Sequence, residues 1–433
     1  MARRSDVELM RTLDEKFVAD WVAFQTMCPT AGVVVDGAPY RRPDGTLDRD
    51  ALDALVRHLV ASWPALRMRI RPMPLGVTTP AWVTAEPELD RHVRIVERVD
   101  PDEIPEVLAG GRNPDLAFDR PLWTLLIAGL PDGDVALVPR VQHALGDGIF
   151  ALRLIDHLTA DAPFEPEGTA PAEPLERAAS PLAILFGAFR VWWREQDGAR
   201  GAWREYTRKS LVRRLRRTGG RILRPRRVRA QQRTPLPPRH HAFRTLELRE
   251  AKLSARATGA SLHDYVVGCS VTAAAAIRDD HAATALLVPV SRRAGSTGEE
   301  RNNISMTQVE VPAGASRAEA VEAVAEQLAA FVGGDPAATG RSLTAEGYTS
   351  YLPWRVRPRY AGRALVRRLV LWPVLDPRHP FAIFASSYAG TLSIAVSGSP
   401  DIDVEAIASD LERHLVGDGD ALTAAPAREG MRG

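Results

Sequence analysis

The feature that most constrains the fold is residues 135–158, where a strand pattern passes into a helix pattern through a short turn. Apolar residues first alternate, as Val135, Leu137 and Val141 do, which predicts a strand with one buried face. From Ile149 onward they recur every three or four residues, which predicts a helix. A strand joined to a helix in this way favours a mixed α/β fold.

The turn between the two runs reads Gln142-His143-Ala144-Leu145-Gly146-Asp147-Gly148. By strand parity His143 lies on the buried side at the end of the strand, where a fixed imidazole facing a cavity suits a general base. The alternative interpretation is a core histidine whose ring is satisfied by a backbone carbonyl. Asp147 precedes the helix and would cap it by accepting a backbone N–H, which is compatible with orienting a catalytic loop.

The spacing of this motif is not specific by itself, because the chain contains it twice. His157 and Asp161 are separated as His143 and Asp147 are, but they lie at the end of the predicted helix and no glycine follows Asp161. His157 therefore serves as an internal control for any role assigned to His143.

Further short motifs follow one another along the chain: Pro80-Ala81-Trp82-Val83, Leu89-Asp90-Arg91-His92-Val93, Asp119-Arg120-Pro121-Leu122-Trp123, Leu286-Leu287-Val288-Pro289-Val290-Ser291 with Arg293, Asn302-Asn303-Ile304-Ser305, and Ser387-Tyr388-Ala389-Gly390. In this order they resemble motifs of the bacterial wax ester synthase/diacylglycerol acyltransferase family, whose mark is His-His-x-x-x-Asp-Gly. His143, Asp147 and Gly148 match that mark, and Gln142 replaces its first histidine. The resemblance runs from about residue 13 to about residue 415.

The resemblance implies an α/β fold of two chloramphenicol-acetyltransferase-like domains, with the active-site tunnel between them and His143 at its middle. It implies that His143 is the general base, that Asp147 orients it and that Gly148 belongs to the motif turn. Asn303 and Ser305 are candidates for substrate binding. The resemblance further implies acyl-CoA as a substrate rather than a cofactor, a hydrophobic alcohol as acceptor, and no metal.

Two departures from the family pattern concern the substrates more than the reaction class. Gln142 stands in place of a histidine, and the Asn-Val-Pro-Gly-Pro loop is not recognisable between Arg341 and Phe381. They leave open a condensation-type enzyme of natural-product biosynthesis, which would form an ester or amide from an acyl group on a carrier protein. Since no Gly-x-Ser-x-Gly elbow or Cys–His pair is evident, direct transfer is favoured over an acyl-enzyme.

A basic segment interrupts the otherwise nearly balanced charge of the chain. Between Arg190 and Arg229 there are fifteen basic residues and three acidic ones, with tryptophans interleaved. One interpretation is an interfacial segment on anionic lipid, and another is a surface for the phosphates of coenzyme A. A third is a solvated, partly disordered insert, whereas no recognition-helix or zinc pattern supports nucleic acid. The candidate contacts are Arg213, Arg214, Arg216 and Arg217. A catalytically silent lipid-surface protein is the non-enzymatic alternative, against which the retained motif residues argue.

The length of 433 residues exceeds one ordinary core and predicts two domains. The predicted parts are an N-terminal half, 1–171, a proline-bounded basic segment, 172–240, a C-terminal half, 241–416, and a disordered tail, 417–433. In the C-terminal half the patterns predict five strands, at 243–248, 286–290, 305–311, 381–386 and 392–397. They also predict two helices, at 261–277 and 404–415.

The expected cellular compartment is inferred from sequence features that are absent. Cys28 and Cys269 are the only cysteines, too few for a disulfide framework or metal cluster. The basic N-terminus is not followed by an apolar signal region, and no window of about eighteen apolar residues could span a bilayer. We expect a cytoplasmic protein, with peripheral contact to membrane or lipid inclusions through the basic segment.

Overall fold

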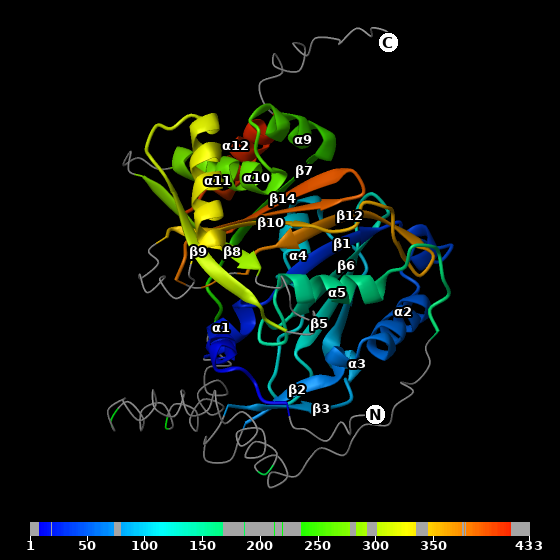
Figure 1. Ribbon diagram of the computed structural model, residues 1–433. Helices are drawn as coiled ribbons and strands as arrows, with labels where there is room; N and C mark the ends of the chain where they lie inside the picture. The colour runs from blue at the N-terminus through cyan, green and yellow to red at the C-terminus, as the bar shows by residue number, and fades with distance from the viewer. Residues whose placement is uncertain are drawn as a thin grey trace, which may run out of the picture. The chain divides into compact units, whose positions relative to one another are not determined.

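The computed structural model describes residues 8–416, apart from 19, 73–78, 278–282, 292–300, 335–344, 375, 377 and all but three positions of 168–234 (Figure 1). The chain divides into two compact units. The first comprises Met1–Pro237, Gly295–Asn303 and Arg359–Arg367. The second comprises Pro238–Ala294, Ile304–Pro358 and Arg368–Gly433. Two short segments from late in the sequence therefore complete the first unit.

The first unit is built on a mixed sheet with the strand order β11–β12–β1–β6–β5–β4. Its strands are β1 (Thr30–Val35), β4 (Val93–Val96), β5 (Trp123–Gly129), β6 (Val135–Val141), β11 (Tyr360–Ala361) and β12 (Ala364–Trp372), of which β12 belongs to this unit up to Arg367. β6 pairs antiparallel with β1 and with β5, whereas β4 and β5 are parallel. A separate antiparallel pair consists of β2 (Met68–Arg71) and β3 (Ala81–Thr84).

The predicted strand before the motif turn is present as β6, but the prediction that it has only one buried face is wrong. Every residue of β6 is buried. The strand lies between two others, and the intervening residues Ala136 and Val138 are as buried as Val135 and Leu137. A short run of apolar residues without a polar side is typical of a strand covered on both faces.

The two longest of the described helices of the first unit each bury an apolar stripe. The helices are α1 (Trp21–Thr26), α2 (Arg49–Ser62), α3 (Leu89–His92), α4 (Ile104–Leu108) and α5 (Gly148–Leu158), preceded by the 3-10 helix η1 (Thr12–Val18). α2 begins after its cap Asp48 and packs against α5, while α4 contacts β1 and β6. The predicted helix after the motif turn is thus confirmed as α5.

The second unit has a six-stranded sheet of its own, ordered β7–β14–β13–β10–β8–β9. Its strands are β7 (His240–Glu247), β8 (Thr284–Ser291), β9 (Ile304–Val311), β10 (Gly347–Pro353), β13 (Phe381–Tyr388) and β14 (Thr391–Gly398). The five strands predicted in this half are confirmed, and β10 is an addition that the sequence patterns did not indicate. β10 runs parallel to β8 and β13, and the other pairs are antiparallel.

Four helices cover one face of this second sheet (Figure 1). They are α9 (Leu248–Ala257), α10 (Leu262–Ala276), α11 (Arg317–Gly333) and α12 (Val404–Val416). Ser261 caps α10 by accepting a hydrogen bond from the Asp264 backbone N–H at 3.1 Å, so α10 begins where the predicted element 261–277 does. α10 and α11 approach closely at Gly268, where a Cβ atom would lie 2.8 Å from the Cα of Val321.

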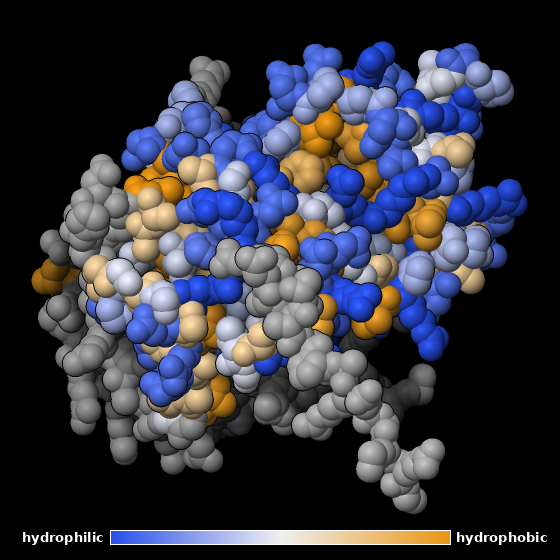
Figure 2. Space-filling view, turned by 90° about the horizontal axis from the view of Figure 1, so that it is seen from above, coloured by the Kyte–Doolittle hydropathy of each residue, from blue (hydrophilic) through white to orange (hydrophobic). Residues whose placement is uncertain are grey.

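Among the helices of the described residues, none has both the length and the apolar composition needed to cross a bilayer. On the face shown in Figure 2, polar side chains predominate and apolar ones lie between them.

Candidate active site around His143

His143 lies in the turn that leads from β6 into α5, and its backbone is fixed on both sides. Its N–H donates to the Met27 carbonyl at 2.9 Å, just after α1. Its carbonyl accepts from the Gly146 N–H at 3.2 Å and from the Asn302 side-chain amide at 2.8 Å. Three separate parts of the first unit therefore hold this one residue in place.

The His143 imidazole is almost completely buried and stacks on an aromatic ring. Only 6% of the residue is exposed, and the Phe17 ring lies 4.2 Å away, centroid to centroid, at 12°. Nδ1 of His143 is buried and has no hydrogen-bond partner among the described residues. Burial lowers the pKa of the imidazole to about 4, because the charged form is poorly solvated there. At neutral pH the ring is uncharged and can accept a proton.

Gln142, which replaces the first histidine of the family motif, connects the turn to the element that carries Phe17. The residue is fully buried. Its Nε2 donates to the Phe17 carbonyl at 2.6 Å, and its Oε1 accepts from the Ala144 N–H at 2.5 Å. A neutral imidazole also offers one donor and one acceptor, so the glutamine retains the same hydrogen-bonding capacity.

Asp147 caps α5 and also binds a distant segment. One carboxylate oxygen accepts from the Phe150 N–H at 2.9 Å, as the capping prediction requires, and the other accepts from the Asn303 N–H at 3.0 Å. The Asp147 N–H donates to the Arg301 carbonyl at 2.9 Å. One carboxylate thus caps α5 and binds the backbone at Asn303, and Gly148 is the first residue of the helix that it caps.

Gly146 is the position in this turn where a side chain would collide. A Cβ atom there would lie 2.0 Å from Cδ1 of Phe150 and 2.2 Å from its Cγ. The backbone at this point passes directly against the Phe150 ring on the first turn of α5. The motif turn therefore depends on a glycine that the family mark does not include.

The segment Arg301–Asn303 packs over the turn and is held by N-terminal residues. Arg301 forms a two-pronged ion pair with Glu8, with Nε–Oε1 at 2.7 Å and NH2–Oε2 at 3.0 Å. Its guanidinium also lies 5.0 Å from the Trp82 ring centroid. The Asn302 carbonyl accepts from Arg11 NH1 at 3.0 Å. The segment is thereby fixed at the position from which Asn302 reaches His143.

Asp14 is a buried carboxyl group near the same segment, on η1 with Phe17. Only 6% of the residue is exposed. Burial raises the pKa of Asp14 to about 6, and a side-chain hydrogen bond with Asn302 and the charges of Arg11, Lys16 and Arg301 oppose the rise. The protonation state of Asp14 therefore changes near neutral pH beside the residue that holds the His143 carbonyl.

The remaining predicted site residues do not all lie beside His143. Asn303 lies in the segment just described, and its backbone N–H is engaged by Asp147. Ser305 lies in β9 of the second unit, half-buried and opposite Val290. Arg213, Arg214, Arg216 and Arg217 lie outside the described residues. His157, the control, is on α5 and stacks on Trp63 at 5.7 Å.

Four residues of the site escaped the sequence reasoning: Phe17, Glu8, Asp14 and Arg301. The first three precede the motif by more than a hundred positions in a stretch without a recognisable pattern. Arg301 is adjacent to the Asn302-Asn303 motif, which was the one available signal for it.

Two further sequence motifs contact each other in the fold. The His92 ring stacks on Trp123 at 4.5 Å, and its Nδ1 is hydrogen-bonded to the Trp123 carbonyl.

Comparison with known proteins gives consistent results for sequence and fold. A 113-residue stretch is 39% identical to a Mycobacterium tuberculosis (strain CDC 1551) protein that is provisionally named a diacylglycerol O-acyltransferase. That alignment spans 25% of this chain and 24% of the relative, so the match covers about a quarter of the relative's length.

Two solved structures resemble the whole chain. The wax ester synthase/diacylglycerol acyltransferase of Marinobacter aquaeolei VT8 superposes with a TM-score of 0.62 at 15% identity, covering 94% of this chain and 98% of that one. The first condensation domain of the calcium-dependent antibiotic synthetase gives 0.57 at 18% identity, covering 95% and 96%. The predicted fold class, α/β with two chloramphenicol-acetyltransferase-like domains, is confirmed by these likenesses.

A family model described as the wax ester synthase/diacylglycerol acyltransferase catalytic domain matches residues 33–266, which is more than half of the chain and includes the motif turn. The residue-level resemblance, the model match and the shared fold agree, and the protein belongs to the wax ester synthase/diacylglycerol acyltransferase family.

Proposed function

We propose that the protein is an O-acyltransferase that moves a fatty acyl group from acyl-CoA to an alcohol, with His143 as the general base. The acceptor is a diacylglycerol or a long-chain alcohol, and the product is a triacylglycerol or a wax ester. The observation that carries this proposal is the buried, uncharged imidazole of His143, held in the motif turn of a member of this family.

In the proposed reaction the imidazole accepts the hydroxyl proton while the alcohol oxygen attacks the thioester carbonyl. The C–O bond forms, and the carbonyl electrons move onto oxygen to give a tetrahedral oxyanion. When the carbonyl re-forms, the C–S bond breaks and the coenzyme A thiolate leaves, taking the proton from the imidazolium. A base that is uncharged at the working pH suits the first step, and an imidazolium suits the last.

Asp147 and Asn302 act in this proposal by positioning rather than by proton transfer. Asp147 uses both carboxylate oxygens on backbone N–H groups, which fix α5 and the Arg301–Asn303 segment. Asn302 then holds the His143 carbonyl. Asn303 and Ser305 remain proposed substrate contacts.

The test is direct incubation of the purified chain with a long-chain acyl-CoA and either a diacylglycerol or a fatty alcohol. Release of free thiol together with the matching ester would support the proposal. Hydrolysis to free fatty acid without ester, with both acceptors present, would contradict it.

The pH profile provides a second expectation. The pKa of His143 is lowered to about 4, so the base stays uncharged down to that pH, and kcat/KM should not fall at the ordinary histidine value of 6.5. Asp14 titrates in the same range, because burial raises its pKa to about 6. We therefore expect any inflection near pH 6 to vanish in Asp14→Asn while the fall toward pH 4 remains. A single acid limb at 6.5 in both proteins would contradict this assignment.

A condensation-type reaction is the second candidate, because the chain also resembles a condensation domain in fold and its departure at Gln142 leaves that reaction open. Gln142 departs from the first histidine of the family mark, although its hydrogen bonds are all satisfied. The same assay with an acyl group on a carrier protein, and an amine or alcohol acceptor, separates the two reactions. Turnover of the carrier-bound donor but not of acyl-CoA would select the condensation reaction.

We propose that the basic segment, which lies outside the described residues, brings a cytoplasmic protein into contact with a membrane or a lipid droplet. Reversing the charges of Arg213, Arg214, Arg216 and Arg217 should weaken binding to anionic vesicles, because each cation near such a surface contributes about 1 kcal/mol. High salt should weaken wild-type binding in the same way. Turnover of a short, soluble acyl-CoA should change little.

Two other results of these measurements would favour a different role for the basic segment or for the protein. Unchanged vesicle binding with a raised KM for acyl-CoA would assign these arginines to coenzyme A phosphates. Full vesicle binding by a wild-type protein without any transferase activity would instead favour the catalytically silent lipid-surface alternative.

A further inference from the structure

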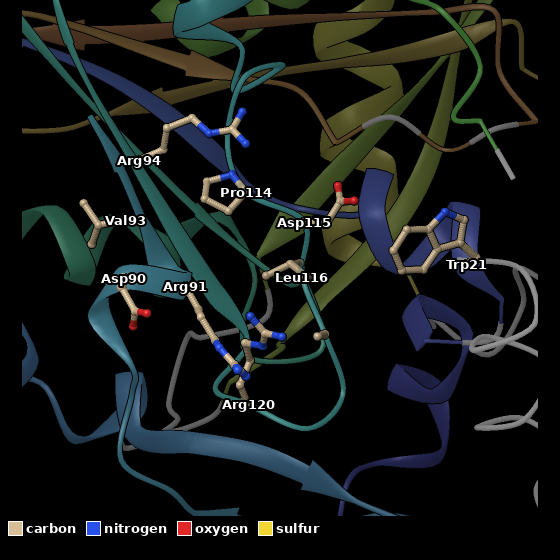
Figure 3. A pocket seen from close by; sticks show the side chains of 10 residues that line it. Trp21, Asp90, Arg91, Val93, Arg94, Pro114, Asp115, Leu116 and Arg120 are labelled. Carbon is tan, nitrogen blue, oxygen red and sulfur yellow. The ribbon is translucent and has the colours of Figure 1, made fainter. Parts of the chain in front are cut away.

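A pocket of about 550 Å³ in the first unit brings together three arginines, Arg91, Arg94 and Arg120 (Figure 3). Arg91 comes from α3, Arg94 from β4, and Arg120 from the loop before β5. In Figure 3 the guanidinium groups of Arg91 and Arg120 lie toward one end of the view and that of Arg94 toward the other. None of these residues belongs to the site around His143.

The guanidinium groups are oriented by neighbours and retain capacity for a ligand. Arg91 pairs through Nε with Glu88 at 3.1 Å, and Arg94 donates through NH1 to the Arg112 carbonyl at 3.1 Å. Arg120 pairs through Nε with the adjacent Asp119 at 3.2 Å. Each of these contacts uses one of the five N–H donors of a guanidinium, whose fork suits phosphate oxygens.

Two residues that line the pocket, Pro114 and Leu116, are held by buried side chains. Gln25 of α1 donates to the Leu116 carbonyl at 2.9 Å and accepts from the Leu116 N–H at 3.1 Å. Arg140 of β6 donates to the Pro114 carbonyl at 2.7 Å. Gln25 and Arg140 themselves do not line the pocket, but they hold the backbone of Pro114 and Leu116 in place without a ligand.

The polar groups of the pocket suit a nucleotide better than a bare phosphate ion. Asp90 and Asp115 also line it, and their carboxylates accept hydrogen bonds from hydroxyl or amino groups. The lining thus combines three cations for phosphate with two acceptors for a sugar or base. Its volume is that of an ordinary small-molecule site.

The pocket shares its scaffold with the motif turn. The loop that carries Arg120 continues to Leu122, whose carbonyl accepts from the Gln142 N–H at 3.0 Å. α1, which supplies Gln25, ends just before Met27, the residue whose carbonyl holds the His143 N–H. A ligand held in the pocket is therefore held by the same elements that position His143.

We propose that this pocket binds the phosphorylated nucleotide end of the acyl-CoA donor, through Arg91, Arg94 and Arg120. The inference rests on the proposed function for the identity of the donor. The nucleotide would anchor in the pocket while the flexible arm of coenzyme A carries the thioester away from it. Binding of the donor and the chemistry of the thioester would then depend on separate residues.

The probe is adenosine 3′,5′-bisphosphate, titrated calorimetrically into the full chain at low and high salt. Arg91→Glu with Arg94→Glu should weaken its binding at least about tenfold, the loss expected for a charge-assisted hydrogen bond. Both side chains are exposed, so the fold should survive. Arg57→Glu on α2, where Arg57 is exposed and paired with Asp53, is the matched control and should bind as the wild type does.

Kinetics should separate binding from chemistry in the same double variant. KM for acyl-CoA should rise by a similar factor while kcat is retained. Turnover of an acyl thioester of N-acetylcysteamine, which lacks the nucleotide, should be unchanged. A fall in kcat for both donors would show that the substitutions damage the scaffold of His143 and would overturn the assignment.

Three further outcomes have definite meanings. Absence of bisphosphate binding by the wild type, or equal binding by the double variant, would overturn the proposal. Binding of phosphatidylglycerol vesicles that depends on Arg91 and Arg94, without bisphosphate binding, would assign the pocket to a lipid headgroup instead. Because titration needs no turnover, a nucleotide-binding but inactive protein would refute the proposed function and leave the nucleotide site standing.

Discussion

Replacing His143 with Ala should lower kcat/KM by roughly a hundredfold or more, the range for losing a positioned proton acceptor. A hundredfold corresponds to about 2.7 kcal/mol of transition-state stabilisation. The imidazole is the uncharged base in the proposed reaction, and water cannot easily replace it at a position of which 6% is exposed. Single-turnover ester formation from acyl-CoA, measured with saturating alcohol, is the appropriate assay.

Stability has to be followed in the same experiment, because the His143 ring stacks on Phe17. His143→Gln keeps much of the side-chain volume and should be inactive as well, so a loss shared by both variants reports chemistry rather than packing. His157→Ala removes a histidine that stacks on Trp63 and should leave turnover almost unchanged. Near-normal turnover in both His143 variants would remove the central claim.

Asp147→Asn should lower both stability and activity, although the side chain keeps its shape. Each Asp147 oxygen accepts a backbone N–H, from Phe150 and from Asn303, and an asparagine can accept at only one of them. The other N–H would meet an amide NH2 group, and an unsatisfied buried donor costs about 1–3 kcal/mol. A shifted Arg301–Asn303 segment would also release the His143 carbonyl from Asn302. Thermal unfolding and kcat of the folded protein measure the two effects.

Asp48→Ala is the control for the capping component, because an asparagine would keep Oδ1, the one oxygen that accepts both helix N–H groups. Asp48 caps α2 by accepting from the Asp50 and Ala51 N–H groups, and no described contact connects it to the motif turn. It should lose stability without losing kcat. If Asp147→Asn behaves in the same way, with activity of the folded fraction intact, Asp147 is a helix cap and nothing more.

Local features of the site could be predicted from the sequence. The strand, the turn and the helix around His143 are encoded within residues 135–158, where periodicity and the Asp147 cap specify each boundary. The same holds for α10, whose start is fixed by Ser261 and Asp264. These elements depend on neighbours a few positions away, so a short window of sequence contains their causes.

The residues that fix the imidazole could not be predicted in this way. Phe17 meets Gln142 across 125 positions, and Asn302 meets His143 across 159. Such pairs leave no periodic pattern, because what they share is a position in the folded chain. The two-sided burial of β6 was missed for a different reason, because Ala136 and Val138 are also apolar and the alternation of Val135, Leu137 and Val141 does not separate two faces.

The composition of the first unit has a consequence for the order of events during synthesis. A nascent chain that has emerged only as far as Pro237 contains His143, Asp147 and Gly148 but lacks Asn302, which holds the His143 carbonyl. Domains generally fold as units while the ribosome is still adding residues. Here the motif turn reaches its final hydrogen bonding only after a further stretch of the second unit has been translated. A half-made chain therefore carries the motif without the arrangement that the proposed chemistry requires.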